Sequence, residues 1–321
     1  MAISNEAAIL EPAGFGLPQK QVSLWGLAFQ RLRKNRLSLI SAILLLSILV
    51  TAALAGTVDA VGRYRPSEQQ YVDILTGPSS SHWFGTDNLG RDTWSRVWAG
   101  TRISLKIGIG TQVVVLIIGI AIGAGAALGG KLTDNVLMRF TDLMYAFPDL
   151  LAIILMRAVL SQRDWPILGT GNPQIPGLPG ALIQVILAIS LVSWVTLARL
   201  VRGQMLALQD AEYVLAAQSM GASTRRVVFS HMLPNTLGPV IVAVTFGVPT
   251  AIFAEAFLGF IGFGLPPPTA SLGTLVAEGQ RFVRVNEWMV IVPSAAIAVL
   301  MLRFTFLGDG LRDALDPRTR R

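Results

Sequence analysis

The sequence predicts an all-α integral membrane protein with six transmembrane helices. Its 321 residues are 52% hydrophobic and only 14% charged, and their mean hydropathy is +0.58. Soluble domains carry about 25% charged residues. Six stretches each hold roughly 20 mainly apolar residues, the length that crosses about 30 Å of hydrocarbon as a helix. These stretches are continuously apolar rather than alternating, which indicates helices and not the strands of a barrel.

The six predicted spans are unevenly spaced along the chain. They lie near residues 37–57, 103–128, 136–160, 181–201, 238–258 and 288–307. The chain then divides into an N-terminal tail, a first span, an outer loop, a core of five spans and a C-terminal tail. These parts are 1–36, 37–57, 58–102, 103–308 and 309–321. A Pro/Gly-rich loop at 164–180, with Pro166, Pro173, Pro176 and Pro179, is expected to be irregular.

The N-terminal span has two interpretations. Ala53-Leu54-Ala55 resembles a signal-peptidase site after an apolar run. A 36-residue leader and an apolar run longer than a usual signal sequence favour an uncleaved anchor instead. We therefore expect the first span to remain in the protein.

The basic residues predict that both termini lie in the cytoplasm. The chain holds 26 Lys and Arg against 19 Asp and Glu, a net charge of +7. With the N-terminus inside, sixteen of the 26 fall in inside segments, as the positive-inside rule expects. The margin comes mainly from the cluster at 31–36 and from Arg225 and Arg226.

The composition excludes several kinds of catalytic site. The chain has no cysteine and two histidines, His82 and His231, so it lacks a thiolate nucleophile and a Cys/His metal centre is not expected. Residues 125–131 have the spacing of a phosphate-binding loop, but Leu132 replaces the Ser or Thr that binds Mg²⁺. We interpret the glycines of this helix, Gly119 and Gly123 among them, as helix-packing positions.

Three acidic residues lie inside the predicted spans. Asp142 and Asp149 are seven residues apart on one face of the third span, and Glu255 lies late in the fifth. Ionisable groups in a membrane are costly and are therefore candidates for function. A proton-coupled secondary transporter would use them as coupling groups, although no convincing internal repeat supports that class. The alternative is structural pairing, in which Arg139 or Arg303 binds Asp142.

The most informative segment is an elbow, defined here as residues 210–235, in the long inside connection between spans four and five. Asp210 can cap a helix whose apolar residues recur at helical spacing and form one face. These residues are Tyr213, Ala216, Ala217 and Met220. The connection offers this face no obvious core, so we expect the face to dock into a groove on a partner protein.

The rest of the elbow predicts a sharp turn and a second helix. Gly221 can end the first helix in a left-handed conformation, Ser223 can cap the second, and Pro234 precedes the return to the membrane. A DNA-binding helix-turn-helix is disfavoured because Arg225 and Arg226, held against a membrane, make a weak electrostatic footprint. A purely structural hairpin at the interface is the other alternative.

The elbow resembles the EAA signature of the membrane subunits of ATP-binding-cassette importers. That signature reads Glu-Ala-Ala, three residues, Gly, nine residues, Ile, one residue, Leu-Pro. Ala216-Ala217, Gly221 and Leu233-Pro234 match it, whereas Leu215 replaces the Glu and His231 the Ile. The forms Glu-Tyr-Val-x-Ala-Ala and His-x-Leu-Pro-Asn are typical of the dipeptide, oligopeptide and nickel importer branch.

Further segments are similar to the C-type permease of that branch. The basic-then-apolar N-terminal span resembles its extra helix. Residues 84–92, with Ser95-Arg96, resemble its outer-loop signature, and residues 259–268 and 308–317 resemble motifs of its last third. The resemblance covers nearly the whole chain and implies a type I importer-like bundle in a bacterial or archaeal plasma membrane.

The resemblance also implies a set of partners. The chain would form half of a pathway for peptides or similar small solutes, with a homologous second permease, two ATPase subunits, an extracytoplasmic substrate-binding protein and membrane lipid, and with no nucleic acid. ATP and Mg²⁺ would bind to the ATPases, so no catalytic residue, cofactor or metal is expected here. The cargo itself stays open among dipeptides, longer peptides and metal chelates.

The residues expected to act fall into two groups. Coupling to the ATPase is expected from Tyr213, Ala216, Ala217, Met220, Gly221, Arg225 and Pro234. Contact with the binding protein is expected from Gly85, Asp87, Gly90, Arg91 and Asp92. The Gly/Pro-rich segment 259–269 is expected at the outer mouth of the pathway or against the binding protein, because irregular backbone at membrane depth needs protein or water around it.

Overall fold

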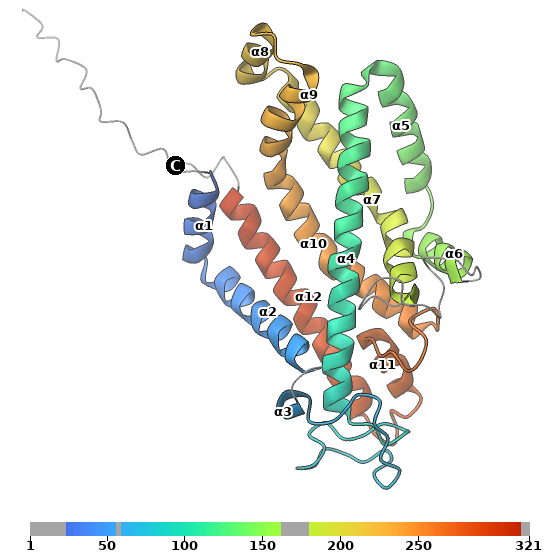
Figure 1. Cartoon of the computed structure of the whole chain (residues 1–321). Coiled ribbons are helices and arrows are strands. Elements are labelled where there is room, and N and C mark those ends of the chain that lie inside the picture. The colour runs from blue at the N-terminus through green and yellow to red at the C-terminus, as the bar shows by residue number, and fades with distance from the viewer. Residues whose placement is uncertain (1–23, 56–58, 162–179, 316–321) are drawn as a thin grey trace, which may run out of the picture.

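The computed structural model describes residues 24–55, 59–161 and 180–315, and every regular element within them is a helix. The long helices run side by side along one axis, with the elbow at one end and the outer loop at the other (Figure 1). The predicted loop at 164–180, with its four prolines, lies almost wholly outside the described residues.

The helices follow one another along the chain, with the outer loop, 63–92, between α3 and α4. In order they are α1 (Leu24–Lys34), α2 (Arg36–Leu54), α3 (Asp59–Gly62), α4 (Thr93–Leu128), α5 (Gly130–Tyr145), α6 (Asp149–Ser161), α7 (Gly180–Gln209), α8 (Glu212–Ser219), α9 (Thr224–Val227), α10 (Leu233–Phe260), α11 (Leu272–Gln280) and α12 (Trp288–Leu315). A π-turn, Val228–Met232, joins α9 to α10.

Five of the described helices are long and apolar enough to cross a membrane. They are α2, α4, α7, the run Thr224–Phe260 that includes α10, and α12. A bent pair, α5 and α6, supplies a sixth crossing if it counts as one span. The all-α membrane fold is therefore confirmed, with one departure in the third span.

The third span is not the single helix predicted for 136–160. It breaks after Tyr145 and resumes at Asp149, and the two parts are bent by 93°. Pro148 lies in the break; it has no N–H to donate and disfavours helical backbone at the residue before it. As a result, Asp142 and Asp149 do not share a helix face.

The last part of the N-terminal tail is helical. α1 carries Arg31, Arg33 and Lys34 in its last turn and packs against α12. Asn35 then separates α1 from α2, and its side chain accepts a hydrogen bond from the Ser38 N–H at 3.3 Å. This cap begins α2 as a separate helix and ends the continuity with α1.

α4 lies at the centre of the bundle, packed most extensively against α7 and also against α10. A Cβ added to Gly119 would lie 2.9 Å from the Leu197 Cβ of α7, and one added to Gly108 would lie 2.9 Å from the Ile252 Cγ1 of α10. Glycine at these points lets the neighbouring helices approach closely. The prediction that Gly119 and Gly123 serve packing is confirmed, since Gly123 faces Ala198 and Val201.

Candidate functional site

The elbow projects from the end of the bundle as α8, a turn and α9 (Figure 1). Ala211 is the N-cap of α8, with no side-chain cap from the described part of the chain, so the prediction that Asp210 caps this helix is wrong. Glu212 occupies the first turn instead, where a negative charge is favourable beside the helix dipole.

α8 has two different faces. Val214 and Ala217 are buried, Ala217 with only 4% of its surface exposed, in a core cluster with residues of α7 and of the π-turn. Tyr213, Leu215 and Met220 are exposed, and Met220 keeps 83% of its surface exposed.

The prediction of one outward apolar face is therefore wrong for Ala217. Ala216 is exposed, whereas Ala217 packs on the chain's own core. The prediction took α8 to have no core to join, but residues of α7, the π-turn and α10 supply one.

Gly221 makes the bend of the elbow. Its φ is +82°, the left-handed conformation that the sequence predicted, and its N–H donates to the Gln218 carbonyl at 2.9 Å. The Ala222 N–H donates back to the Ala217 carbonyl at 3.0 Å, which closes the end of α8. A Cβ at Gly221 would meet no atom within 4 Å, so the constraint on this residue is conformational rather than steric.

The second helix begins at Ser223, whose hydroxyl accepts from the Arg226 N–H at 3.4 Å, as predicted. It then runs without interruption into the membrane span through the π-turn. Pro234 follows directly, at the start of α10. In an α-helix its ring would clash with the carbonyl four residues back; the wider π-turn relieves that clash, and the Asn235 amide donates to the His231 carbonyl at 2.6 Å.

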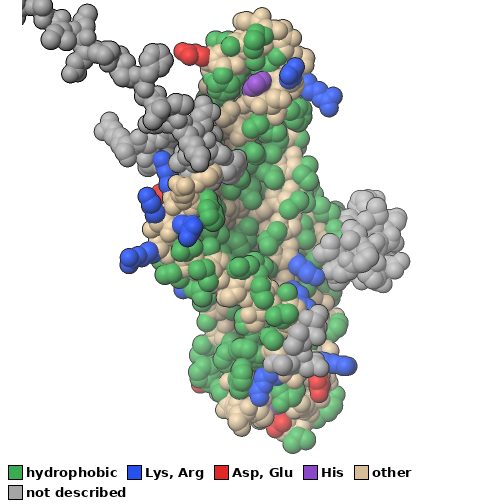
Figure 2. All heavy atoms as spheres, turned by 60° about the vertical axis from the view of Figure 1, so that its left-hand side comes forward, with side chains coloured by type: hydrophobic (Ala, Val, Ile, Leu, Met, Phe, Trp, Pro, Cys, Tyr) green, Lys and Arg blue, Asp and Glu red, His purple; other side chains and the backbone are tan. Residues whose placement is uncertain are grey.

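The exposed surface of the elbow combines basic and apolar groups. Arg225, Arg226 and Phe229 line a surface hollow with Ser223, and Phe229 is largely exposed. Figure 2 shows Lys and Arg side chains beside a histidine and several hydrophobic side chains at this end of the molecule. Partial burial raises the pKa of the Tyr213 phenol, and its hydrogen bond with Asn235 offsets part of that rise, so the phenol is uncharged at neutral pH.

The acidic residues of the third span have other partners than predicted. Arg199 of α7 donates to Asp142 at 2.7 Å, whereas Arg139 and Arg303 were the predicted partners. Structural pairing was thus the right interpretation and both proposed partners were wrong. A second pair that the sequence reading missed lies beside it: Arg202 Nε and Nη2 each approach one oxygen of Asp134 at 2.5 Å.

Glu255 is nearly inaccessible, with 1% of its surface exposed. Its Oε2 accepts from the Ser104 hydroxyl of α4 at 2.8 Å, and Ser104 in turn accepts from the Leu272 N–H of α11 at 3.3 Å. Asp149 is exposed at the start of α6. Asp142 and Glu255 are thus each held by a partner on another helix, whereas Asp149 is exposed.

One buried cation escaped the sequence reading, which considered intramembrane acids alone. Arg157 of α6 donates to the Gln184 side chain at 2.7 Å and to the Gly264 carbonyl at 3.4 Å. It joins α6 and α7 to the Gly/Pro-rich segment, whose Leu265 lies in a second core cluster with Ile153 of α6 and Leu182 of α7. Its position inside an apolar helix was the signal that could have found it.

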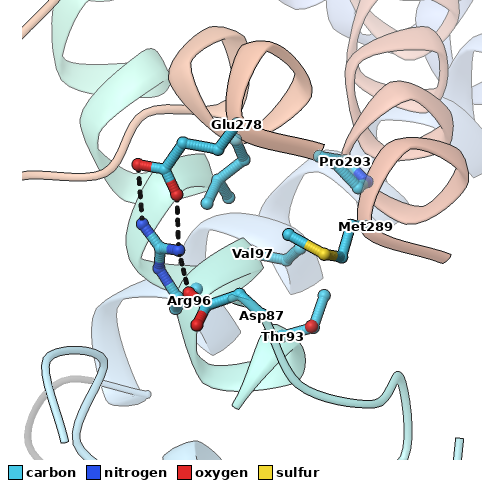
Figure 3. Close-up of a pocket in the computed structure, with 8 residues that line it drawn as sticks. Asp87, Thr93, Arg96, Val97, Glu278, Met289 and Pro293 are labelled. Carbon is cyan, nitrogen blue, oxygen red and sulfur yellow. Dashed lines mark hydrogen bonds and ion pairs between the residues drawn. The ribbon is translucent and has the colours of Figure 1, made fainter. Parts of the chain in front are cut away.

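The outer-loop signature forms a buried charge cluster with α11 (Figure 3). Asp87 pairs with Arg91, whose Nε lies 2.6 Å from Oδ2, and also contacts Arg96. Glu278 of α11 completes the cluster: its Oε2 lies 2.7 Å from Arg96 Nη1 and 3.1 Å from Arg91 Nη2. The sequence reading missed Glu278 because nothing in its spacing links it to residues almost two hundred positions earlier.

The neighbouring Asp92 begins α4. Its Oδ2 accepts from the Ser95 N–H at 2.8 Å, and its Oδ1 lies 2.9 Å from Nδ1 of the buried His82. The His82 ring stacks on Tyr64, with centroids 4.8 Å apart. The signature thus ties the outer loop to the first turn of the central helix.

The signature residues do not form an exposed docking face. Gly85, Asp87, Gly90, Arg91 and Asp92 are all buried, so they offer no exposed surface to a binding protein in this structure, and their contact with one stays a prediction. Other residues of the loop are exposed instead: Tyr71, Val72, Ile74 and Trp83.

Comparison with known proteins places this arrangement in a family. Residues 117–321 match the model of the "binding-protein-dependent transport system inner membrane component". Residues 23–78 match the "N-terminal TM domain of oligopeptide transport permease C". The chain belongs to this family of permeases.

Curated relatives of this permease match along nearly their whole length. The oligopeptide transport system permease protein OppC of Bacillus subtilis is 39% identical over 95% of this chain and 93% of its own. The dipeptide transport system permease protein DppC of the same organism is 38% identical over 92% of this chain and 86% of its own. The resemblance stated from the elbow and outer-loop motifs is confirmed.

Solved structures confirm the fold. Inward-facing structures of the MetNI methionine ABC transporter match with TM-scores of 0.53 and 0.50, at 15% and 19% identity. They cover 69% and 68% of this permease and 96% and 94% of the matched chains. The bundle is that of an ABC importer membrane subunit, and the secondary-transporter alternative is not favoured.

Proposed function

We propose that this permease forms half of the pathway of an ATP-driven peptide importer, with α8 as the helix that docks into an ATPase subunit. The observation that carries the proposal is the two-faced packing of α8. Val214 and Ala217 fix it to the chain's own core, while Tyr213, Ala216 and Met220 face outward.

The packing beneath α8 gives this helix a mechanical role. The same core cluster contains Val201 and Met205 of α7 and Val228 and Met232 of the π-turn. Because packed cores deform little, a displacement of α8 would move the ends of two membrane helices together. That is the kind of rigid coupling by which an ATPase could bias the bundle between two states.

The partners follow from the same assignment. A second permease would complete the pathway, two ATPase subunits would bind Mg²⁺ and hydrolyse ATP, and a substrate-binding protein would deliver cargo from outside. The present chain would carry out no catalysis and hold no cofactor. Exposed apolar residues on α2, such as Leu46, and on α5, such as Val136, would face lipid or the second permease.

The location and the cargo are proposed from the relatives and the charge pattern. The permease would lie in the plasma membrane of a bacterium or archaeon with cytoplasmic termini, so that α1 and the elbow face the cytoplasm. The names of the relatives support dipeptides or oligopeptides as cargo. No residue is assigned to bind them, since the binding protein would make the main selection.

Thiol crosslinking tests the docking role directly, because the natural chain has no cysteine. Met220→Cys should crosslink to a cysteine placed in the cleft of the ATPase in intact cells. Leu132→Cys, in the first turn of α5 and also largely exposed, is the matched control and should crosslink much less. Absence of any Met220→Cys adduct with the ATPase would end the proposal.

The energy source is tested in reconstituted vesicles that contain the whole complex. Uptake should require hydrolysable ATP. Uptake driven by a proton gradient without ATP would contradict an ATP-driven importer and return attention to Asp142, Asp149 and Glu255.

A further inference from the structure

The two N-terminal helices, α1 and α2, meet at the edge of the bundle beside α12 (Figure 1). One side of this junction is seated on α12. The Ser38 hydroxyl donates to the Phe306 carbonyl at 3.1 Å, and a Cβ added to Gly310 would lie 3.3 Å from the Leu32 Cδ1. These contacts fix the inner side of the junction and leave its other side facing out of the bundle.

The outward side of the junction carries three exposed cations. Arg33 and Lys34 lie in the last turn of α1, and Arg36 is the first residue of α2. We call these three residues the basic junction. Cations in the last turn of α1 suit its helix dipole, whereas a cation in the first turn of α2 is unfavourable there. The stability of the two helices therefore does not account for Arg36.

No acid neutralises the basic junction within the residues that the structure describes, because none of its three cations forms an ion pair there. α1 has no acid in its first turn and α2 has none. On α12, which packs against α1, the nearby acids Asp309 and Asp313 are exposed to solvent. Arg31, the remaining cation of α1, is half-buried and has an interaction of its own within the chain. Three like charges within four positions repel one another, so a bound anion would stabilise the junction.

An exposed apolar stripe begins directly at Arg36. Ile40 and Ile43 follow it at i+4 and i+7, which places all three side chains on one face of α2. Ile40 is 50% and Ile43 58% exposed. α2 is long and apolar enough to cross a membrane, and only 22% of its most apolar window is buried in the protein. The basic junction therefore lies where the apolar part of the span begins, at the depth of the lipid headgroups.

Phe29 adds an apolar group beside the cations on α1. Its side chain is 61% exposed, and the Arg33 guanidinium carbon lies 6.0 Å from its ring centroid. A free phosphate ion or an acidic protein segment would use the cations and leave the stripe at Ile40 and Ile43 uncovered. A phospholipid uses both, because its charged headgroup and its acyl chains are joined in one molecule.

We propose that the basic junction binds the headgroup of an anionic phospholipid, whose acyl chains lie along the α2 stripe. The lipid phosphate would accept hydrogen bonds from the guanidinium groups of Arg33 and Arg36. The Lys34 ammonium would add a third positive charge beside the headgroup. The site requires only that α2 crosses the bilayer, so the inference does not depend on the proposed import function.

Fluorescence quenching tests the site in the full-length permease, together with the subunits that purify with it, in phosphatidylcholine vesicles. Ile43→Cys carries the fluorophore about 10 Å along α2 from Arg36; the natural chain has no cysteine, and cysteines in other subunits are removed. Phosphatidylglycerol with a spin label on its acyl chain should quench the fluorophore roughly ten-fold more effectively, at equal mole fraction, than spin-labelled phosphatidylcholine.

Two charge variants show which cations attract the lipid. Arg33→Gln with Arg36→Gln should lower the ratio of the two quenching efficiencies to about two, because only Lys34 remains in the basic junction. Arg281→Gln with Arg284→Gln removes the same charge from two exposed arginines between α11 and α12 and should leave the ratio unchanged. Equal reductions in both variants would show a response to net charge and overturn the site.

The remaining outcomes separate a lipid from other occupants. Equal quenching by the two lipids, with all three cations present, would overturn an anionic-lipid site. Quenching by neither lipid would show that protein covers the stripe, which also overturns it. Inorganic phosphate should lower the ratio no more than sodium chloride at the same ionic strength. Stronger competition by phosphate would show a site for free anions and contradict the lipid.

Discussion

Arg199 Nη2 lies 2.7 Å from Asp142 Oδ1, so that α7 binds the side of α5 just before the broken third span turns away. The guanidinium also lies over the Tyr145 ring, 4.5 Å from its centroid. One turn along α7, Arg202 holds Asp134 at the other end of α5. Two arginines of α7 thus hold α5 near both of its ends.

The two clamps should contribute unequally to stability. Asp142 and Arg199 have side chains that are 64% and 37% exposed, so Arg199→Ala should cost about 0–1 kcal/mol. Arg202 makes two bonds to Asp134 at a less exposed position, and Arg202→Ala should cost about 1–2 kcal/mol. Unfolding of the permease in lipid nanodiscs measures the stability lost in each variant. Equal losses would show that hydrogen-bond geometry and burial do not determine how much each ion pair contributes.

The effect of a substitution at Gly221 should depend on how readily the new residue adopts the left-handed conformation, and not on the size of its side chain. Its surroundings are open, but a β-branched residue in the left-handed region is strained by about 1–2 kcal/mol. Gly221→Val should leave the complex assembled and reduce substrate-stimulated ATP hydrolysis, because the bend that joins α8 to α9 is altered. Gly221→Asn, which adopts this conformation more readily, should retain most of the stimulation. If valine and asparagine behave alike, the conformation of this residue is not what couples the elbow.

Adjacent alanines in α8 should separate folding from docking. Ala217→Leu overfills the core beneath the helix and should destabilise the permease by about 1–3 kcal/mol. Ala216→Leu places the same volume on the exposed face and should leave thermal stability unchanged while weakening association with the ATPase. Thermal unfolding and co-purification with the ATPase distinguish the two. A stability loss in the Ala216 variant would show that this face packs within the permease.

Asp92, the N-cap of α4, should contribute more to stability than Asp73, the other carboxylate beside His82. Asp92→Ala removes the acceptor for the Ser95 N–H and the partner of His82, and should cost at least about 1 kcal/mol. Asp73→Ala alters a partly exposed carboxylate that lies 3.8 Å from the same histidine and should cost less than about 0.5 kcal/mol. Hydrogen exchange in residues 93–97 should rise in the first variant alone; protection that stays unchanged would exclude Asp92 as the cap that orders this turn.

Local chemistry in the sequence predicted much of the architecture. The length of the apolar runs placed the spans, Gly221 and Ser223 predicted the turn and the second cap, and small residues predicted where helices approach. The break at Pro148 was missed because hydropathy measures how apolar a stretch is and does not register its direction. The proline itself was a visible signal for that break.

The partners of the site residues could not be predicted, because they come from helices far away in the sequence. Periodicity put Ala216 and Ala217 on one face, but only the neighbouring helix ends decide which alanine is covered. Likewise, the spacing of Asp142 suggested Arg139 nearby, while the actual partner arrives from α7. The outer signature looked like a surface motif because it is polar, yet its charges neutralise one another inside the protein, with Glu278 supplied from another part of the chain.

The π-turn has a consequence for how motion spreads from the elbow. Its wider hydrogen-bond ring makes Val228–Met232, like Pro239 and Pro249 further on, an interruption in the regular hydrogen bonding of the helix that continues to Phe260. We therefore expect a displacement of α9 to bend the helix at Val228–Met232 before it moves the part of α10 in the outer leaflet. Faster amide exchange across these five residues than in the turns on either side would reveal that compliance.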